Sequence, residues 1–535
     1  MYADSGQLES VEILRGFDLC IVGAGAAGLA LAHRLIGSPL KVLVLAIGSP
    51  TDRGLPAGSP QKIYGGTLGP FLRNVDPLFL RRSRLNMYGG TTNHFGFWAR
   101  PLDEPDFLPR PGYRSASWPI PRASLDPYYA EANAYGRYGP FNYDDLSFWE
   151  NVLGGTGLPQ TGEDRLTKAV FHAQYADAVR QFQIQLGGAL QAASNVTVMF
   201  NSHLVSIEAT ADGTGGGKHV ARLACTSLRD GKLDGRFWVE AERYVLALGG
   251  IENVRLLKLS DDLGNNRRDQ LGRGFMVHPL LTTAAEASFS SPLPLETRSF
   301  FRDQQVRLRP DVGEPIGFVH DSAPLVSPSL MAKYTVFNAW GVLVPTPATL
   351  AKERIGNFRV ILRFNSRGDR VEVNLNWEQV PNEESFVGLD HTSVDPVFGQ
   401  PVAHVDWRLR EEDKRTALRA LDLVRDLLER NGATGFKVLT DLSGGPEYWS
   451  FGKEDTALAT GDHHMGALRM SASSDDGIVD PNCRFHGVDN LYAAGSAVFP
   501  TSGYANPTLT IVALALRLAD HLAGRPAPRP NREVR

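Results

Sequence analysis

The chain has few cysteines and no long uninterrupted apolar run. Its three cysteines, Cys20, Cys225 and Cys483, are odd in number and widely spaced, which excludes a disulfide framework and a cysteine-based metal or haem motif. No apolar run reaches the roughly 18 residues that a membrane-spanning helix needs, and the first residues lack the basic start and apolar segment of a secretory signal. The formal net charge is only −4, which predicts neither a nucleic-acid nor a membrane partner. We therefore expect a soluble, cytoplasmic protein.

A glycine-rich turn lies near the N-terminus. Residues 17–22 (F-D-L-C-I-V) form a short apolar run typical of a buried strand, and residues 29–35 have a helical pattern. Between them, Gly23, Gly25 and Gly28 fit the spacing G-x-G-x-x-G. Such glycines permit the tight turn, the close approach of backbone to a pyrophosphate, and close packing of helix on strand. The strand–turn–helix context predicts a dinucleotide-binding site.

One element of that site is missing. The apolar run at residues 41–45 is expected to end in an acidic residue that binds the adenosine ribose, and Ala46 stands there instead. Asp52 is a nearby substitute, or the ribose is held by backbone and water. We favour an affinity distributed over many contacts, in which this carboxylate is dispensable.

The segment from Asp462 to His521 carries the strongest signal for a reaction centre. It begins with the histidine pair His463 and His464, and a helix is predicted to open at Asn506-Pro507, because asparagine is a strong N-cap and proline suits the first helical position. Residues 509–518 are apolar on most sides, which indicates a buried helix. A helix N-terminus close to a titratable histidine suggests a centre that stabilises an anion.

The rest of the chain alternates between loops and regular elements. Residues 51–186 are rich in proline, glycine and arginine, and we expect loops and short helices there. Residues 171–190 have a helical pattern, and 196–209 a strand pattern. Residues 358–364 and 370–377 predict a hairpin. Residues 411–429 predict an amphipathic helix with a solvated charged face, and the Pro/Arg-rich last dozen residues predict a disordered tail.

These motifs together resemble the glucose–methanol–choline (GMC) family of flavin oxidoreductases along nearly the whole chain. The matching segments are residues 23–28, 89–90, 246–252, 272–279, 378–382 and the C-terminal segment. The C-terminal A-N-P-T-L-T is similar to pyranose oxidases and to bacterial relatives acting on sugars and polyols. Ala494, where many members carry an acidic residue, fits this branch.

The resemblance implies an α/β fold with two domains. A discontinuous Rossmann-like FAD-binding domain is expected over residues 1–110, 187–279 and 461–522. A mixed-sheet α+β substrate-binding domain with connecting loops is expected over 111–186 and 280–460, and the disordered tail over 523–535.

The resemblance also implies roles for individual residues. His463 is expected to be the general base and Asn506 its partner on the substrate hydroxyl, whereas His464 is expected to be a supporting residue. The alternatives are a core histidine for His463 and a plain helix cap for Asn506. The residues expected at FAD are Gly23, Gly25, Ala26, Ala27, Gly28, Gly89, Gly90, Thr91, Asn93, His94, Val205, Gly249, Gly495, Ser496, Asn506, Pro507 and Thr508.

His94 admits two functional interpretations. Some family members carry a histidine at this position that is covalently linked to the flavin, and others hold FAD noncovalently with a similar turn. Phe95, Phe97 and Trp98 follow it and predict either an aromatic wall for a sugar or core packing.

The activity implied is the oxidation of a secondary alcohol of a sugar, glycoside or cyclitol-like substrate to a ketone. Hydride passes to flavin N5, and oxygen or another acceptor reoxidises the cofactor. A histidine is a suitable acceptor for the hydroxyl proton. The alternatives are a lyase on the same FAD scaffold that uses His463 for acid–base chemistry alone, and a flavoprotein that serves only as a binding partner.

Overall fold

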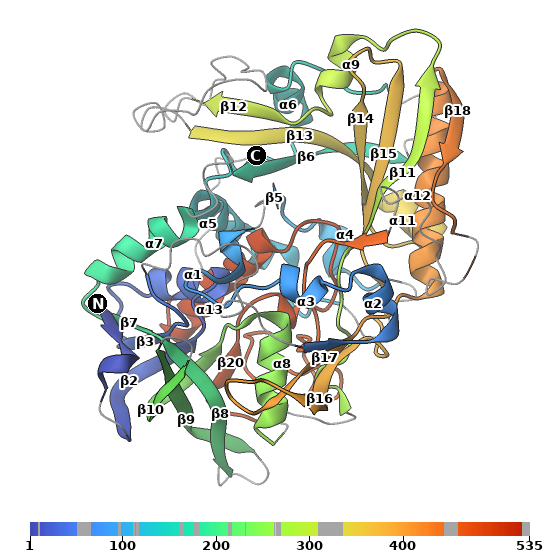
Figure 1. Ribbon diagram of the computed structural model, residues 1–535. Helices are drawn as coiled ribbons and strands as arrows, with labels where there is room; N and C mark the ends of the chain where they lie inside the picture. The colour runs from blue at the N-terminus through green and yellow to red at the C-terminus, as the bar shows by residue number, and fades with distance from the viewer. Residues whose placement is uncertain are drawn as a thin grey trace.

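Two large β-sheets and the helices around them form the molecule (Figure 1). The computed structural model describes residues 1–8, 11–50, 66–94, 98–110, 113, 117–159, 165–174, 181–211, 217–229, 232–261, 263, 269–308, 335–442, 444 and 458–526. The expected tail lies largely outside these residues, as do Phe95 and Phe97. In the described part of the chain, no helix combines the length and the apolar character that crossing a bilayer requires.

The first sheet has eight strands in the order β1-β7-β3-β2-β10-β9-β8, with β20 paired to β10. The pairs among β1, β7, β3, β2, β10 and β20 are parallel, and β8 and β9 add an antiparallel edge. Its strands are β1 (Tyr2–Asp4), β2 (Glu12–Val22), β3 (Val42–Leu45), β7 (Val196–Phe200), β8 (Ser202–Ala211), β9 (Lys218–Arg229), β10 (Lys232–Leu246) and β20 (Leu491–Ala493). This is the Rossmann-like sheet that the sequence predicts.

The glycine turn joins β2 to helix α1 (Ala26–Arg34) as expected. Gly23 has a φ of +108°, which a residue with a side chain rarely adopts. A Cβ on Gly28 would lie 1.9 Å from the carbonyl oxygen of Gly23, so only glycine allows the helix to begin this close to the strand.

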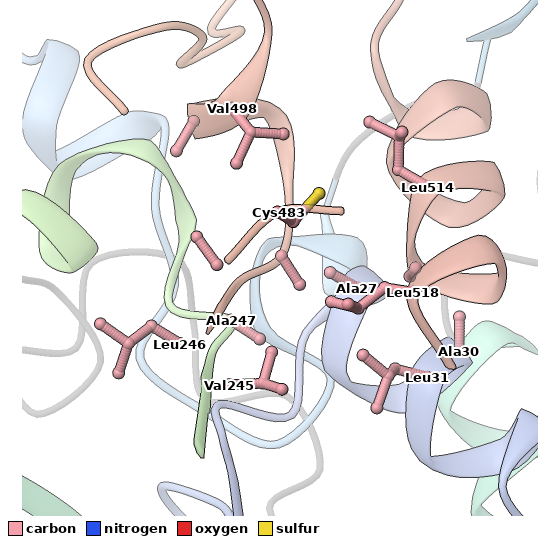
Figure 2. Packing of buried hydrophobic residues seen from close by; sticks show 14 of the residues in the cluster. Ala27, Ala30, Leu31, Val245, Leu246, Ala247, Cys483, Val498, Leu514 and Leu518 are labelled. Atoms are coloured by element: carbon pink, nitrogen blue, oxygen red, sulfur yellow. The ribbon is translucent and has the colours of Figure 1, made fainter. Parts of the chain in front are cut away.

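The C-terminal helix α13 (Thr508–Leu522) packs against α1 beside the sheet. Figure 2 shows Ala27, Ala30 and Leu31 of α1 beside Leu514 and Leu518 of α13, all of them buried. The small alanines let the two helices approach closely. A bidentate pair between the Arg34 guanidinium and the buried Asp520 carboxylate, at 2.9 Å for both contacts, fixes the far end of the helix pair.

The second sheet has nine strands in the order β18-β11-β15-β14-β13-β6-β5, with β12 paired to β13 and β19 paired to β11. Its pairs are antiparallel. They are β5 (Trp98–Ala99), β6 (Leu166–Gln174), β11 (Pro279–Phe289), β12 (Gln304–Leu308), β13 (Thr335–Pro345), β14 (Phe358–Phe364), β15 (Arg370–Trp377), β18 (Ala433–Val438) and β19 (Leu458–Thr460).

The predicted hairpin and amphipathic helix both belong to this part of the molecule. The hairpin is β14 and β15, paired so that Arg359 lies opposite Asn376. The helix is α12 (Glu411–Arg430), and its apolar stripe, with Ala417, Leu421 and Val424, is buried, while its charged residues apart from the buried Asp413 are partly or fully exposed. It lies beside β18 and the hairpin at one edge of Figure 1.

The remaining elements connect or cover the two sheets. A third sheet has the order β16-β17-β4. Its strands are β4 (Gly66–Leu68), β16 (Phe386–Val394) and β17 (Pro401–Asp406). The other helices are α2 (Pro70–Val75), α3 (Phe79–Arg82), α4 (Glu104–Phe107), α5 (Asp126–Gly136), α6 (Leu146–Val152), α7 (Gln181–Ala192), α8 (Gly249–Leu259), α9 (Leu295–Ser299) and α11 (Pro347–Glu353).

Two local expectations were wrong. Residues 171–190 do not form one helix, since 166–174 are strand β6 and α7 begins at Gln181. β6 is buried for most of its length between β5 and β13, and the apolar run of a fully buried strand cannot be distinguished from a buried helix by periodicity. Residues 196–209 form two strands, β7 and β8, because Asn201 adopts a φ of +55° between them.

His172 on β6 is a fully buried histidine at the core of the second sheet. Its ring stacks on Tyr143 at 4.2 Å between centroids and lies against Trp149 at 4.6 Å. Burial lowers its pKa to about 3. In the unfolded chain it has an ordinary value near 6.5, so the unfolded state alone binds a proton as the pH falls below that value. The stability that rests on neutral His172 is therefore complete above pH 6.5 and is lost between there and pH 3.

We expect His172→Phe to weaken the acid sensitivity of the fold. Between pH 6.5 and pH 4 the free energy of unfolding should fall less steeply in the variant, by up to about 1.4 kcal/mol per pH unit. Denaturant unfolding at several pH values measures this slope. His391→Phe, at an exposed histidine, should keep the wild-type slope. Equal slopes for His172→Phe and the wild type would contradict the assignment.

Candidate active site

A cavity of about 720 Å³ lies between the two large sheets. One wall consists of the glycine turn, the ends of β3 and β10, and the start of α8. The opposite wall consists of β11, β14 and β15 of the second sheet. The loop at 460–464, the segment 494–496 and the start of α13 close one side. Ligands of open parallel sheets bind at the carboxyl ends of the strands, which is where this cavity is.

Bare backbone makes the first wall suitable for a dinucleotide. A Cβ added to Gly25, Gly249 or Gly495 would meet no protein atom within 4 Å, because each glycine faces open space in the cavity. The start of α1 lines the same wall, and its first amide groups have no partner within the helix. The positive end of a helix beside a bare glycine turn favours phosphate groups.

Most residues expected at FAD line this cavity. They are Gly23, Gly25, Ala26, Ala27, Gly90, Thr91, His94, Gly249, Gly495, Ser496, Asn506, Pro507 and Thr508. Both interpretations of His94, the covalent link and the noncovalent contact, require this position.

Four expected residues do not line it: Gly28, Gly89, Asn93 and Val205. Gly28 packs behind the turn against Gly23. The Asn93 side chain donates to two carbonyl groups of its own loop. Side chains alternate along β8, so Leu204 lines the cavity instead of Val205.

The second strand of the nucleotide unit presents apolar groups where a carboxylate is expected. Ala46 is fully buried, and its neighbours Leu45 and Ile47 line the cavity. The alternative candidate, Asp52, lies outside the described residues.

A chain of hydrogen bonds crosses the cavity at the predicted reaction centre. The Nη1 of Arg359 donates to Asn506 Oδ1 at 2.7 Å, and Asn506 Nδ2 lies 3.1 Å from His463 Nε2. His463 Nδ1 lies 2.8 Å from His278 Nδ1, and His278 Nε2 lies 2.7 Å from the carbonyl oxygen of Gly503. The structure thus brings His463 and Asn506 together, as the sequence predicts.

The direction of every bond in this chain follows from its two ends. The Gly503 carbonyl can only accept, so His278 Nε2 carries a proton. A neutral His278 then has a lone pair on Nδ1, and His463 must donate to it from its own Nδ1. His463 Nε2 is therefore the unprotonated nitrogen, and it accepts from the amide of Asn506. The geometry assigns the basic lone pair of His463 to the nitrogen nearest Asn506.

Burial and a nearby cation keep both rings neutral. Burial lowers the pKa of His278 to about 4. Burial also lowers the pKa of His463 well below its usual value, and the positive charge of Arg359 lowers it further. A histidine with such a pKa is unprotonated at neutral pH and available as a proton acceptor.

The His464 side chain is not part of the hydrogen-bond chain that contains His463, and it contacts other residues. Its ring packs on Phe79 and Phe275. Its Nε2 donates to Ser83 Oγ at 2.9 Å, because that hydroxyl already donates to the Phe79 carbonyl. The backbone oxygen of His464 accepts from Ser496 Oγ at 2.6 Å. These contacts fit the supporting position expected of it.

The expected helix cap at Asn506 was wrong in detail. Helix α13 begins at Thr508 with Pro507 before it, and no side chain caps its N-terminus. The Asn506 side chain binds Arg359 and His463 instead. Asn506 is thus directed into the reaction centre by these two bonds.

Sequence reasoning missed several residues that surround this centre. Arg359, Asn374 and Asn376 line the cavity from the predicted hairpin. Alternate positions on a strand share a face, so the polar residues at 359, 374 and 376 on two strands predicted to pair could have indicated this wall. His278 was recognised only as part of a segment between domains.

The fold and the cavity define an oxidoreductase that binds a dinucleotide cofactor. Residues 381–515 match the family model described as GMC oxidoreductase. The chain resembles GMC oxidoreductases over this segment, and it is an FAD-dependent enzyme that acts on CH–OH donors.

Relatives and solved structures cover nearly the whole chain. A 2-methyl-1,2-propanediol dehydrogenase of Mycolicibacterium austroafricanum is 23% identical over 95% of this chain and 95% of its own. A paromamine 6'-oxidase of Streptomyces fradiae is 26% identical over 95% and 92%. The crystal structure of pyridoxine 4-oxidase from Mesorbium loti has a TM-score of 0.54 at 16% identity, covering 95% of this chain and 99% of its own, and it supports the fold.

Two glycine substitutions should separate cofactor binding from folding. Gly25→Ala places a methyl group in open cavity space, so we expect a stable protein that loses FAD, with at least about a tenfold weaker affinity. Gly28→Ala drives its methyl group into the Gly23 carbonyl, so we expect a destabilised fold, by about 3 kcal/mol. Flavin titration of the apoproteins and their thermal unfolding measure the two effects. Unchanged flavin affinity in Gly25→Ala would contradict the assignment of this wall.

Proposed function

We propose that the enzyme oxidises a secondary alcohol of a sugar, glycoside or cyclitol-like substrate to a ketone, with His463 as general base and Asn506 as its partner. The observation that carries the proposal is the contact between His463 Nε2 and Asn506 Nδ2, 3.1 Å apart on the cavity wall. A substrate hydroxyl that enters here meets one acceptor of its proton and one donor to its oxygen.

Residues of the protein itself accept the proton that the substrate hydroxyl loses. The hydroxyl donates to His463 Nε2, and Asn506 Nδ2 turns from that nitrogen to the hydroxyl oxygen. His278 holds the His463 ring through Nδ1, so the proton arrives on Nε2 without rotation of the ring. When bound, FAD supplies the hydride acceptor that makes proton removal a net oxidation. Arg359, next to Asn506, places a positive charge near the oxygen as it loses its proton.

The same proposal assigns cofactor binding to one part of the molecule and substrate binding to the other. The part over residues 1–110, 187–279 and 461–522, which contains the first sheet, holds the cofactor. The part over residues 111–186 and 280–460, which contains most of the second sheet, supplies the substrate wall. The start of α13 belongs to the cofactor part and lies beside the reaction centre. Its positive end favours negative charge at the cofactor.

The relatives support the substrate class in general terms. By name they include a diol dehydrogenase and a paromamine 6'-oxidase. Both names denote CH–OH oxidation, and together they allow either oxygen or another acceptor to reoxidise the flavin.

Anaerobic mixing of the holoenzyme with sugars, glycosides and cyclitols tests the redox role. We expect at least one of them to remove the oxidised-flavin absorbance. His463→Asn should slow this bleaching by about a hundredfold or more, while His391→Asn at an exposed site should leave it unchanged. Product formation with a flavin that stays oxidised would indicate a lyase instead. Undiminished bleaching by His463→Asn would refute the base assignment.

The pH profile tests the state of His463 separately. Because burial and a nearby cation lower its pKa, the base should remain unprotonated well into the acid range. The rate of flavin reduction should be flat around neutral pH, and its acid limb should lie below pH 6.5, the usual histidine value. Stopped-flow reduction across this range measures the limb. A limb at or above the usual value would mean that the neighbouring charge is screened.

A further inference from the structure

Arg359 is a buried cation without a carboxylate partner. Its residue is 4% exposed, and no carboxylate among the described residues forms an ion pair with it. The guanidinium carbon lies 4.5 Å from the centre of the Phe171 ring and 5.3 Å from that of Trp98. Its guanidinium donates a hydrogen bond to the neutral amide of Asn506. Removing a charge from water is costly unless an opposite charge joins it.

Residues that line the same cavity beside Arg359 carry atoms without a hydrogen-bond partner within the part of the chain that the structure describes. Arg359 Nε, Asn374 Nδ2 and Asn376 Oδ1 are buried and have no hydrogen-bond partner among the described residues. Asn374 Oδ1 already accepts from the Thr283 amide at 3.0 Å, which fixes the side chain with its Nδ2 unused. Asn376 lies directly opposite Arg359 in the hairpin, and its amide can present either end to a ligand. Buried polar atoms in folded proteins nearly always have partners.

The charges around the cavity leave this wall positive. Asp462 is the one carboxylate among the described lining residues, and it pairs with Arg82 at 3.1 Å. Arg363 follows Arg359 on the same face of β14, nearer to solvent, and has no ion pair with a described carboxylate. The glycine turn that suits phosphate belongs to the opposite wall. The positive wall is therefore suited to a second anion, distinct from the phosphate groups on the opposite wall.

We propose that Arg359, Asn374 and Asn376 form a binding site for a carboxylate of the alcohol substrate, so that the preferred substrate is a hydroxy acid such as a sugar acid. The inference rests on the proposed function, because the site adjoins the His463–Asn506 pair. A guanidinium fork and a fixed amide donor match the two oxygens of a carboxylate. Arg359 already touches Asn506, so the carboxylate lies a few bonds from the hydroxyl that is oxidised.

Matched substrate pairs test the inference in the holoenzyme. In each pair a carboxylate replaces a hydroxymethyl group: glucuronate and glucose, gluconate and glucitol, lactate and 1,2-propanediol. In anaerobic bleaching we expect the acid of a productive pair to react at least about tenfold more efficiently than its neutral partner. Arg359→Gln should lower the efficiency with both partners, because its charge near the reacting oxygen is lost, and the loss with the acid should exceed that with the neutral partner by at least about tenfold. Arg359→Lys should restore part of the preference.

The controls separate anion binding from other effects of the charge. Arg370→Gln removes an exposed arginine of the same hairpin and should keep the wild-type preference. Asn374→Asp keeps the oxygen that binds Thr283 and places a negative charge toward the ligand, so it should weaken the acids selectively. It serves in place of Arg359→Gln if that variant does not retain flavin. Equal or better reaction of the neutral partners in the wild type, or an equal loss for both in Arg359→Gln, would overturn the inference.

Benzoate, which has no hydroxyl to oxidise, distinguishes failure of the inference from failure of the proposed function. If no compound bleaches the flavin, the redox proposal fails on this panel. Saturable perturbation of the oxidised-flavin spectrum by benzoate, lost in Arg359→Gln and kept in Arg370→Gln, would still support the anion site. No saturable perturbation together with no preference for acids would overturn it.

Discussion

The arrangement of the reaction centre depends on one hydrogen bond, the contact of His278 Nε2 with the Gly503 carbonyl at 2.7 Å. A carbonyl cannot donate, and this simple fact sets the direction of every bond up to Arg359. His278, on the segment that leads into the second sheet, thereby determines which nitrogen of His463 is basic. A local change at Gly503 would therefore alter the hydrogen bonds as far as Arg359, at the other end of this series. The reaction centre is best regarded as one polarised unit whose members act together.

This unit also explains why the two sheets must be held in one arrangement. Arg359 comes from the second sheet, whereas Asn506 directly precedes the helix that packs on α1. Each part alone presents a buried polar group with too few partners. Joined across the cavity, Arg359 and Asn506 share a bond of 2.7 Å. Arg359 Nε, Asn374 Nδ2 and Asn376 Oδ1, all on residues of the substrate wall, have no hydrogen-bond partner among the described residues.

The sequence predicted the parts of the fold that are decided locally. Strand β2, the glycine turn and α1 follow from apolar runs and from backbone geometry that glycine alone permits, and α12 follows from its amphipathic period. His463 and Asn506 were found because they fall in a recognisable segment. Arg359 was not found, because its role depends on the register of β14 against β15 and on the approach of a loop from the C-terminal segment. Burial of β6 on both faces removed the alternation that would have marked it as a strand.

The packing of α13 on α1 through Ala27 and Ala30 has a mechanical consequence. The start of α1 faces the cofactor wall, and Asn506 stands immediately before α13, so the separation of cofactor and substrate hydroxyl is set by how closely two helices touch. A methyl group added between the two helices would push them apart and so change the distance between the cofactor and the substrate hydroxyl. Reactivity in such an enzyme can be tuned from the core, by residues that never meet the cofactor or the substrate. Substitutions that accumulate in the contact between these two helices can therefore change the turnover rate.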